Sequence, residues 1–338
     1  MNERYRFSSE NESLGGLDLT EEEEGIITRL GITPDDFRKL LTDGPFAEGS
    51  YALLFDSPTA DSDLVAKVWK NPRHDSRRAA NENASLRLLR IRDFKNAPKI
   101  RGYLQPSTIL FEEKIEGEVV EEFSNEQIDR LAVALADLHS IKLNAYGKPF
   151  MERKLGSRMD YLLDGVETLH KIVEPFSEQV EVTELIDRAL DKVVIMANGS
   201  RDAFLATNFT LIHFDLNKNN ILFSKNDGAP VIVDWEQASS GDNAMDVAKL
   251  FLKSDFDEDQ KKEFISAYGR HSDGDDPYFE ERLKVYELFV LVNSIIWRLG
   301  VLRDMPQQVA SENEDQFYSR VKVNFDHEVG VLSNLLLE

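Results

Sequence analysis

The hydrophobic pattern of this chain changes character near residue 114, and this change limits the folds that it can adopt. Before that point the apolar runs are short. Ser50–Asp56 (SYALLFD) and Leu64–Lys70 (LVAKVWK) flank the turn-forming segment SPTADSD, and Ile109–Phe111 is a third run. After residue 114, helical spacing dominates. The sequence therefore predicts an α+β chain with two lobes, a small antiparallel-sheet lobe and a larger, mostly helical lobe.

The predicted division is an N-terminal helical extension at 1–44, the small lobe at 45–114 and the helical lobe at 115–338. Within the extension, Thr20 and Glu23 form a capping-box pattern, and Thr33 with Pro34 opens a second short helix. A helix at Arg77–Arg92 is predicted to pack through Ala80, Ala84, Leu88 and Ile91. The later helices are predicted at Gln127–His139, Met159–Val173, Val182–Met196, Asp259–Tyr268, Tyr278–Leu299 and Phe317–Leu336.

Composition and charge exclude several classes of function. With 62 acidic and 40 basic residues, the formal net charge is −22, and no basic stripe is present, so we expect no nucleic-acid partner. The chain has no cysteine, which excludes disulfides and thiol chemistry. The polar N-terminus resembles no signal peptide, and the apolar stretch Leu288–Leu302 is predicted to be a core helix, so we expect a cytoplasmic protein without a membrane partner.

The segment Leu211–Phe223 (LIHFDLNKNNILF) carries the first candidate site. Asp215 precedes Asn220 by five residues, and apolar residues anchor both ends of the loop. A carboxylate can orient or deprotonate a hydroxyl, and a nearby amide oxygen can help to hold a metal ion, a combination that suits magnesium-dependent phosphoryl transfer. The alternative is an ordinary loop in which Asp and Asn form turns.

A second acid follows the next apolar run. Val231–Glu236 (VIVDWE) is predicted to be a buried strand, and Asp234 at its end lies 14 residues beyond Asn220. Because Mg²⁺ prefers several hard oxygen ligands, Asp234 and Asn220 together predict a metal site. Two roles are open for Glu236: its carboxylate could contact the metal or the substrate, or it could cap the turn.

The third element lies in the small lobe. Lys67 is enclosed by apolar neighbours in LVAKVWK, and Glu82 lies on the helix that follows. A strand lysine that faces a cleft can bind nucleotide phosphates, and a helix glutamate can fix its ammonium. Lys70 is the competing lysine, but its odd spacing from Lys67 places it on the opposite face of the strand.

Taken together, Lys67, Glu82, HFDLNKNN at 213–220 and VDWE at 233–236 resemble the aminoglycoside phosphotransferase and choline kinase superfamily. These are small-molecule kinases with a protein-kinase-like fold. The resemblance extends to LAVALADLHS at 131–140, AYG at 145–147 and GDNAMDVAKLF at 241–251, and it covers roughly residues 45–300. The VDWE form differs from the D-F-G motif of protein kinases.

The resemblance implies a role for each matching residue. Asp215 would be the catalytic base or hydroxyl-orienting group, and Asn220 and Asp234 would be Mg²⁺ ligands. Lys67 would bind the phosphates of the nucleotide, with Glu82 as its partner. The implied donor is ATP, with GTP as the alternative.

The same resemblance implies where the nucleotide lies. Gly49 and Ser50 match a loop that covers the phosphates, although an ordinary hairpin turn fits this single glycine equally well. The linker between the lobes, near 112–115, would meet the adenine through its backbone, which implicates Glu113 and Ile115.

Four further polar residues are expected to have structural roles. The resemblance implies that His213 and Asp246 brace the catalytic loop. His139 is expected in the core, and Lys218 is expected to be a solvated loop lysine rather than a group that neutralises the transferred phosphoryl.

The implied acceptor is a hydroxyl group of a small molecule, bound between Asp215 and a helical insert at about 150–205. Acidic residues are frequent in and after this insert: Glu152, Asp160, Asp164, Glu167, Asp273, Asp275 and Asp276. If they face the cleft, a cationic acceptor such as an aminoglycoside, choline or thiamine is expected. If they form solvated faces, a neutral sugar or a homoserine-like acceptor fits as well.

Two other functions compete with this one. A catalytically inactive nucleotide-binding module would keep the lobes but lose a chemical group, whereas every expected group is present. A protein kinase would carry D-F-G, A-P-E and an activation segment, but only about six residues separate Glu236 from the next helix.

Overall fold

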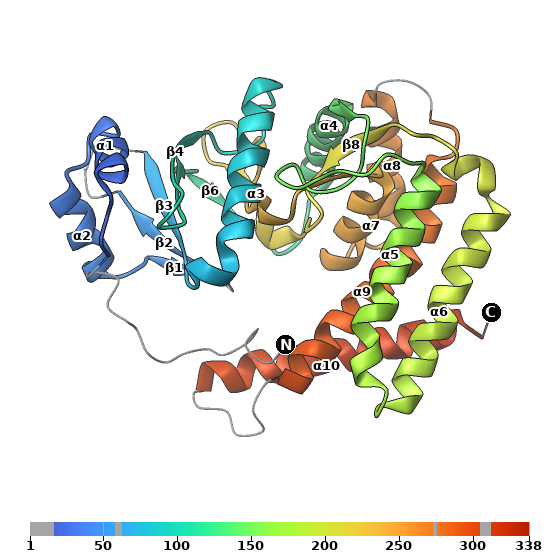
Figure 1. The fold of residues 1–338 in the computed structure, drawn as a ribbon. Coiled ribbons are helices and arrows are strands. Elements are labelled where there is room, and N and C mark those ends of the chain that lie inside the picture. Colours follow the sequence, from blue (N-terminus) through green and yellow to red (C-terminus); the bar gives the residue numbers. More distant parts are fainter. Residues whose placement is uncertain (1–16, 50, 58–62, 273–275, 305–311, 338) are drawn as a thin grey trace.

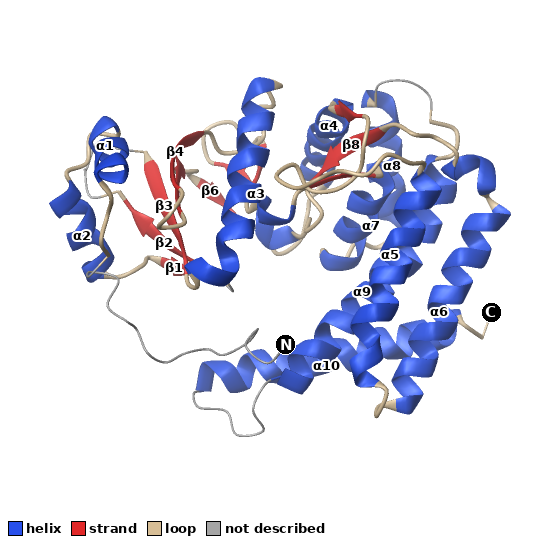
Figure 2. Ribbon diagram, in the orientation of Figure 1, coloured by secondary structure: helices blue, strands red, loops and turns tan. Residues whose placement is uncertain are grey.

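The structure, a computed structural model, describes residues 17–49, 51–57, 63–272, 276–304 and 312–337. Ser50, Asp273 and Asp275 therefore lie outside the described residues. Figure 1 shows a small sheet lobe and a larger helical lobe, and Figure 2 shows that helices make up most of the larger one. The α+β, two-lobed fold class predicted from the sequence is confirmed.

An antiparallel sheet forms the small lobe. Its five strands follow the order β1-β2-β3-β5-β4. They are β1 (Ala47–Glu48), β2 (Ala52–Asp56), β3 (Leu64–Trp69), β5 (Ile109–Glu113) and β4 (Ile100–Leu104). The sequence pattern missed β1, which is only two residues long, and β4, whose sequence IRGYL contains no continuous apolar run. In the central strand β3, Lys67 lies opposite Leu54 of β2 and Leu110 of β5.

The N-terminal helices α1 (Glu21–Arg29) and α2 (Pro34–Asp43) cover the outer face of this sheet (Figure 1). Ile27 and Phe37 from the two helices are buried against Phe55, Val68 and other side chains of the sheet. Both predicted N-caps are present, including the Thr20–Glu23 capping box. The helices therefore pack on the lobe, as the sequence predicted.

Glu23 fixes α1 to the turn between β4 and β5. Its buried carboxylate accepts hydrogen bonds from the N–H of Ser107 (3.0 Å) and the N–H of Thr20 (2.9 Å).

Glu23→Ala leaves the buried Ser107 N–H without a partner, so we expect it to lower the free energy of unfolding by about 1–3 kcal/mol. Urea denaturation measures this loss. The exposed neighbour provides the control, because Glu22→Ala removes no such bond and should have almost no effect. Equal losses would contradict this role for Glu23.

Helix α3 (Pro72–Ile91) covers the inner face of the sheet and lies between the two lobes (Figure 1). The predicted apolar stripe on this helix is wrong at its end, because Ile91 is 78% exposed, whereas the half-buried Leu88 packs against the core. The fully buried side chains include Leu86, Leu89 and the acidic Glu82. An apolar pattern could not find this face, since it passes through Glu82, an ionisable residue whose partner Lys67 lies on the sheet.

Seven helices of the larger lobe are described, and the six helical segments predicted there from the sequence lie within them, apart from their outermost residues. They are α4 (Asn125–Ser140), α5 (Arg158–Val173), α6 (Val180–Gly199), α7 (Asn243–Lys253), α8 (Glu258–His271), α9 (Phe279–Asp304) and α10 (Glu312–Leu335). Of the helices in the described ranges, α9 alone is long and apolar enough to cross a bilayer, but 72% of that apolar stretch is buried inside the protein. It is packed as the core helix that the sequence predicted.

Two small antiparallel sheets hold the candidate loops. One has the order β10-β9-β6 and the other β11-β8-β7. Their strands are β6 (Gly117–Glu118), β9 (Ile221–Ser224), β10 (Pro230–Ile232), β7 (Lys142–Leu143), β8 (Phe209–Ile212) and β11 (Ser239–Gly241). The loop that contains Asp215 joins β8 to β9, and the loop that contains Asp234 joins β10 to β11. The pairing of these strands places both loops at the same end of the lobe.

Candidate functional site

Three of the predicted residues meet between the lobes. The Nζ of Lys67 donates hydrogen bonds to Glu82 Oε2 at 2.7 Å and to Asp234 Oδ1 at 2.6 Å. Glu82 and Asp234 are 152 residues apart in the chain, and they come from α3 of the small lobe and the β10–β11 loop of the large one. The structure thus brings Lys67 and Asp234, which the sequence analysis assigned to different lobes, into direct contact.

Burial and charge act against each other in this trio. Burial disfavours the charged form of Lys67, but the carboxylates of Asp234 and Glu82 outweigh it and raise the pKa of Lys67 well above its usual value. Burial also opposes ionisation of Asp234, yet the Lys67 ammonium lowers the pKa of Asp234. For the fully buried Glu82, burial prevails and raises its pKa to about 8. Asp234 is thus the ionised partner that keeps Lys67 charged.

The backbone at Asp234 is left-handed, with φ 66° and ψ 61°. This conformation is uncommon for a residue other than glycine, and asparagine and aspartate adopt it most readily. The turn is held because the Trp235 N–H donates to Glu82 Oε1 (3.1 Å) and the Trp235 indole donates to the Ile232 carbonyl (2.7 Å). Glu82 thereby fixes both Lys67 and the loop that carries Asp234.

Asp246 of α7 holds the loop that carries Asp215. Its buried carboxylate accepts the N–H of His213 at 2.6 Å and the N–H of Phe214 at 2.7 Å. Phe214 has a positive φ of 66°, a strained conformation that these two hydrogen bonds stabilise. The bracing role expected for Asp246 is confirmed.

His213 joins the two loops. Its Nε2 lies 2.9 Å from the Val233 carbonyl oxygen, which only accepts, so Nε2 carries the proton. Its Nδ1 then accepts the N–H of Asp215 at 3.3 Å. The imidazole is neutral in this arrangement, and it braces the loops rather than exchanging protons with a substrate.

Asp215 uses its backbone, not its side chain, to hold the loop. The side-chain amides of Asn217 and Asn220 both donate to the Asp215 carbonyl at 2.9 Å. No hydrogen bond of the Asp215 carboxylate is found among the described residues. Burial raises the pKa of this carboxyl above its usual value, although the nearby Lys249 opposes the rise. A carboxylate with this environment is a stronger base than an exposed one.

Asn220 and Asp234 offer oxygen ligands for a metal. Because the amide nitrogen of Asn220 is bonded to the Asp215 carbonyl, its amide oxygen is the group left for another partner. Asp234 uses Oδ1 for Lys67, and its side chain remains 38% exposed. Within the described ranges no three His, Cys, Asp or Glu side chains are grouped to hold an ion by themselves. One carboxylate and one amide oxygen fit Mg²⁺, which takes its remaining ligands from phosphates and water.

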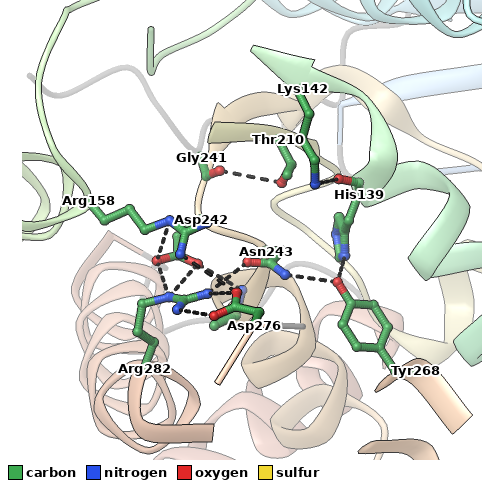
Figure 3. Close-up of polar contacts among 11 residues, drawn as sticks. His139, Lys142, Arg158, Thr210, Gly241, Asp242, Asn243, Tyr268, Asp276 and Arg282 are labelled. Carbon is green, nitrogen blue, oxygen red and sulfur yellow. Dashed lines mark hydrogen bonds and ion pairs between the residues drawn. The ribbon is translucent and has the colours of Figure 1, made fainter. Parts of the chain in front are cut away.

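Buried polar contacts fix the start of α7, the helix that carries Asp246 (Figure 3). Asp242 caps this helix and accepts the Nε–H of Arg282 at 2.9 Å, while Arg158 Nε lies 3.7 Å away. Both arginines are buried and belong to α9 and α5. Three distant segments are thus joined behind the loop that carries Asp215.

A second set of contacts in Figure 3 runs from α7 to α4. The Asn243 amide donates to the Tyr268 hydroxyl (2.9 Å), and this hydroxyl lies 2.8 Å from Nδ1 of His139. Nε2 of His139 in turn lies 3.4 Å from Asp246. His139 is buried in the core, as expected, and supports Asp246 from behind.

Among the described residues Glu236 does not cap the turn, and contact with metal or substrate stays a prediction. Its carboxylate accepts the guanidinium of Arg78 at 2.7 Å and the indole N–H of Trp69 at 3.3 Å. It therefore ties the loop after Asp234 to α3 and β3. The sequence analysis missed Arg78 and Trp69, which only the folded chain brings to Glu236.

Two lysines considered in the sequence analysis point elsewhere. Lys218 Nζ lies 3.5 Å from Asp255 and donates to the Glu121 carbonyl at 3.4 Å. Lys70 forms an ion pair with Glu48 at 2.6 Å. Lys67 is thus the lysine that reaches the site, as the strand alternation predicted.

The residues predicted to hold the rest of the nucleotide lie at the edge of the small lobe. Gly49 is in the turn between β1 and β2, where its N–H donates to the Ala52 carbonyl (2.8 Å). Glu113 ends β5, and Ile115 follows it in the linker between the lobes. The Ile115 backbone has no hydrogen-bond partner among the described residues. Their contacts with a nucleotide stay a prediction.

The sequence analysis placed Glu112 at the start of the linker but assigned no role to its side chain. Glu112 lies two residues beyond Leu110, the partner of Lys67 across the sheet, and so shares the face of Lys67. Its side chain is buried, and Oε2 has no hydrogen-bond partner within the described part of the chain. Burial raises the pKa of Glu112 to about 7, against the attraction of Lys67. Strand register provides the signal that would have found it.

The raised pKa of Glu112 makes stability depend on pH. Between pH 4.5 and 7 the unfolded chain releases this proton before the folded chain does, so wild-type stability falls as pH rises, by up to about 3 kcal/mol. Glu112→Gln removes this dependence. Urea denaturation at pH 5 and pH 8 measures the free energy of unfolding of both proteins. Relative to wild type, we expect that of the variant to be about 2 kcal/mol higher at pH 8 than at pH 5. The exposed Glu116→Gln should show no such gain, and a pH-independent difference for Glu112→Gln would contradict the assignment.

Of the acids that the sequence analysis named in and after the insert, those that the structure describes are engaged within the protein, apart from Glu152, for which no partner is described. Asp160 accepts the N–H of Ser157 (2.7 Å) at the start of α5. Asp164 pairs with Lys154 at 2.7 Å, and Asp276 pairs with Arg282 at 2.8 Å. Glu167 pairs along α5 with Lys171 at 2.6 Å. These acids are intramolecular partners, so they do not argue for a cationic acceptor.

Comparisons with known proteins agree with this geometry. A sequence model of the phosphotransferase enzyme family matches residues 45–282. Choline kinase LicA from Streptococcus pneumoniae is similar with a TM-score of 0.57 and 18% identity, over 84% of this chain and 91% of its own. An ethanolamine kinase from Plasmodium vivax is similar with a TM-score of 0.60 and 12% identity. The match covers 99% of this chain and 97% of the ethanolamine kinase.

A third similar structure is APH(2")-IIa in a ternary complex with streptomycin and ATP. Its TM-score is 0.53 at 20% identity, over 75% of this chain and 84% of its own. At such identities these structures establish the fold alone. No sequence among the curated proteins matches this chain.

Proposed function

Given that the chain belongs to the phosphotransferase enzyme family, and so is a small-molecule kinase, we propose that it transfers the γ-phosphoryl group of ATP to a hydroxyl group of its acceptor. GTP is the alternative donor. The observation that carries the proposal is the Lys67 ammonium, which bonds Glu82 and Asp234 from the two lobes beside the braced Asp215 loop.

In this reaction the acceptor oxygen forms a bond to the γ-phosphorus while the bond from that phosphorus to the β–γ bridging oxygen breaks, and the nucleoside diphosphate leaves. The hydroxyl proton passes to the Asp215 carboxylate. Lys67 would bind the phosphates, and Asn220 and Asp234 would hold Mg²⁺. The bound ion would neutralise charge on the phosphates, and positioning by these side chains supplies most of the remaining rate.

The test is to incubate the purified chain with MgATP and a panel of alcohols, amino alcohols, sugars and hydroxy acids. We expect nucleoside diphosphate and a phosphate monoester in equal amounts, both lost when Mg²⁺ is chelated. ³¹P NMR identifies the ester. Nucleotide binding without an ester for any acceptor would favour the inactive module, and phosphorylated protein hydroxyls would favour a protein kinase.

A further inference from the structure

One face of α7 carries three charged side chains in line. Asp246 holds the catalytic loop, and Lys249, one turn later, places its Nζ 4.2 Å from the centre of the Phe214 ring. Lys253 follows after another turn. Residues three and four apart share a helix face, so both lysines lie on the side of α7 that faces Asp215.

The two lysines have few acidic partners. Lys249 is half-buried, and it has no hydrogen bond or ion pair in the part of the chain that the structure describes. Lys253 donates to the Ser294 hydroxyl of α9, and Glu328 of α10 lies 3.9 Å from its Nζ.

Glu328 is already neutralised by another cation. It accepts two hydrogen bonds from Arg298, at 3.0 and 3.1 Å, and one from Ser294 at 2.9 Å. Asp246 is likewise satisfied by two backbone N–H groups and His139. Of the charged groups on this face of α7, the ammonium groups of Lys249 and Lys253 are therefore the ones that act on the Asp215 carboxylate without a full set of acidic partners of their own.

This surplus of positive charge is costly. Burial lowers the pKa of Lys249 although Asp215 and Asp246 oppose the change. Burial also lowers the pKa of Lys253 to about 8, against the attraction of Glu328. Partly buried cations without a full set of partners are usual where a ligand supplies the missing anion.

We propose that the acceptor carries an anionic group, a carboxylate or a phosphate, that binds Lys249 and Lys253 while its hydroxyl meets Asp215. The inference rests on the proposed phosphotransfer and narrows its acceptor class. An anionic acceptor takes the place of the cationic acceptor considered in the sequence analysis. The insert acids whose partners are described pair within the protein, whereas Lys249 and Lys253 face Asp215. Lys253 lies one helical turn, about 5–6 Å, beyond Lys249, so the anion is separated from the hydroxyl by a chain of a few atoms.

The test uses three acceptors of equal length that differ only in charge: 4-hydroxybutyrate, 1,4-butanediol and 4-amino-1-butanol. Glycerol 3-phosphate, compared with glycerol, separates phosphate from carboxylate recognition. ADP release gives turnover, and the thermal shift with MgADP gives binding when turnover is absent. We expect kcat/KM for the preferred anion to exceed that of its neutral partner by about tenfold or more.

Lysine variants separate charge recognition from a structural role. Lys249→Gln and Lys253→Gln should each raise KM for the anionic acceptor by about tenfold while KM for the neutral diol changes little. Lys262→Gln is the control, since this lysine is 74% exposed on α8 and pairs with Asp259. A structural role would instead affect all acceptors alike.

The inference is overturned if the neutral or cationic compound is preferred, or if no compound shows an advantage for the anion in either turnover or thermal shift. It is also overturned if the lysine variants affect the charged and neutral acceptors equally. The proposed function fails separately, when neither MgATP binding nor any phosphate ester is found.

Discussion

Asp215→Asn is expected to lower phosphoryl transfer by about 10²- to 10⁴-fold, because the carboxylate is the group placed to take the hydroxyl proton. The substitution should leave the fold intact. The loop is held by the N–H and C=O of Asp215, which bond His213, Asn217 and Asn220, and these groups are unchanged in the variant. Binding of MgATP should therefore stay close to wild type.

Steady-state ADP release and a nucleotide titration separate these two effects. Asp191→Asn, an exposed change on α6, is the matched control and should keep full activity. Because burial raises the pKa of Asp215, wild-type activity should fall with decreasing pH at a pKa above the usual value for aspartate. A variant that keeps more than about a tenth of the wild-type rate would rule out Asp215 as the base.

Lys67→Met is the second change with a large expected effect, and it acts on both activity and stability. The nucleotide loses its phosphate-binding ammonium, so we expect kcat/KM for ATP to fall by about 10²-fold or more. Glu82, which is fully buried, loses its cation as well. Breaking a buried pair by removing one partner costs about 3–5 kcal/mol when the other partner stays charged.

The stability loss should depend on pH. Burial already raises the pKa of Glu82 to about 8, and without Lys67 the pKa rises further. The folded variant then holds this proton, so it is most stable at low pH and loses stability as pH rises. Urea denaturation at pH 6 and pH 8.5 measures the difference.

A double variant separates the two effects. In Lys67→Met/Glu82→Gln the buried carboxyl of Glu82 is replaced by a neutral amide, and the glutamine oxygen can still accept the Trp235 N–H that Glu82 accepts at 3.1 Å. Glu112 and Asp234 still lack the lysine, so we expect stability above pH 7 to recover in part while activity stays low. If the double variant regained activity, or if Lys67→Met lost no stability relative to wild type, Lys67 would not have the central place assigned to it.

Local patterns in the sequence were enough for the parts of the site that are close along the chain. Apolar neighbours identified Lys67 as a buried strand lysine, and the five-residue spacing of Asp215 and Asn220 marked a loop that the structure indeed closes through the Asp215 carbonyl. The capping box of α1 was readable because it lies within four residues. Each of these features depends on contacts between near neighbours.

The residues that were missed depend on packing between distant segments. Glu112 belongs to the site only through its register with β3, and Arg78 only through Glu236, 158 residues away. On α3 the apolar pattern failed because the buried face passes through Glu82, whose partner Lys67 lies on another element. Lys249 and Lys253 were not considered in the sequence analysis, because their place depends on the packing of α7 beside Phe214.

The central claim is that Asp234 and Asn220 hold a divalent ion against the phosphates of a nucleotide beside Lys67. The most direct measurement is EPR titration of Mn²⁺, in place of Mg²⁺, with ADP and either wild type or Asp234→Asn. Asparagine tolerates the left-handed backbone at this position, so the substitution removes the carboxylate ligand rather than the turn. We predict a ternary complex in wild type and an Mn²⁺ affinity weaker by about tenfold or more in the variant. Equal Mn²⁺ affinities in the two proteins would contradict the claim.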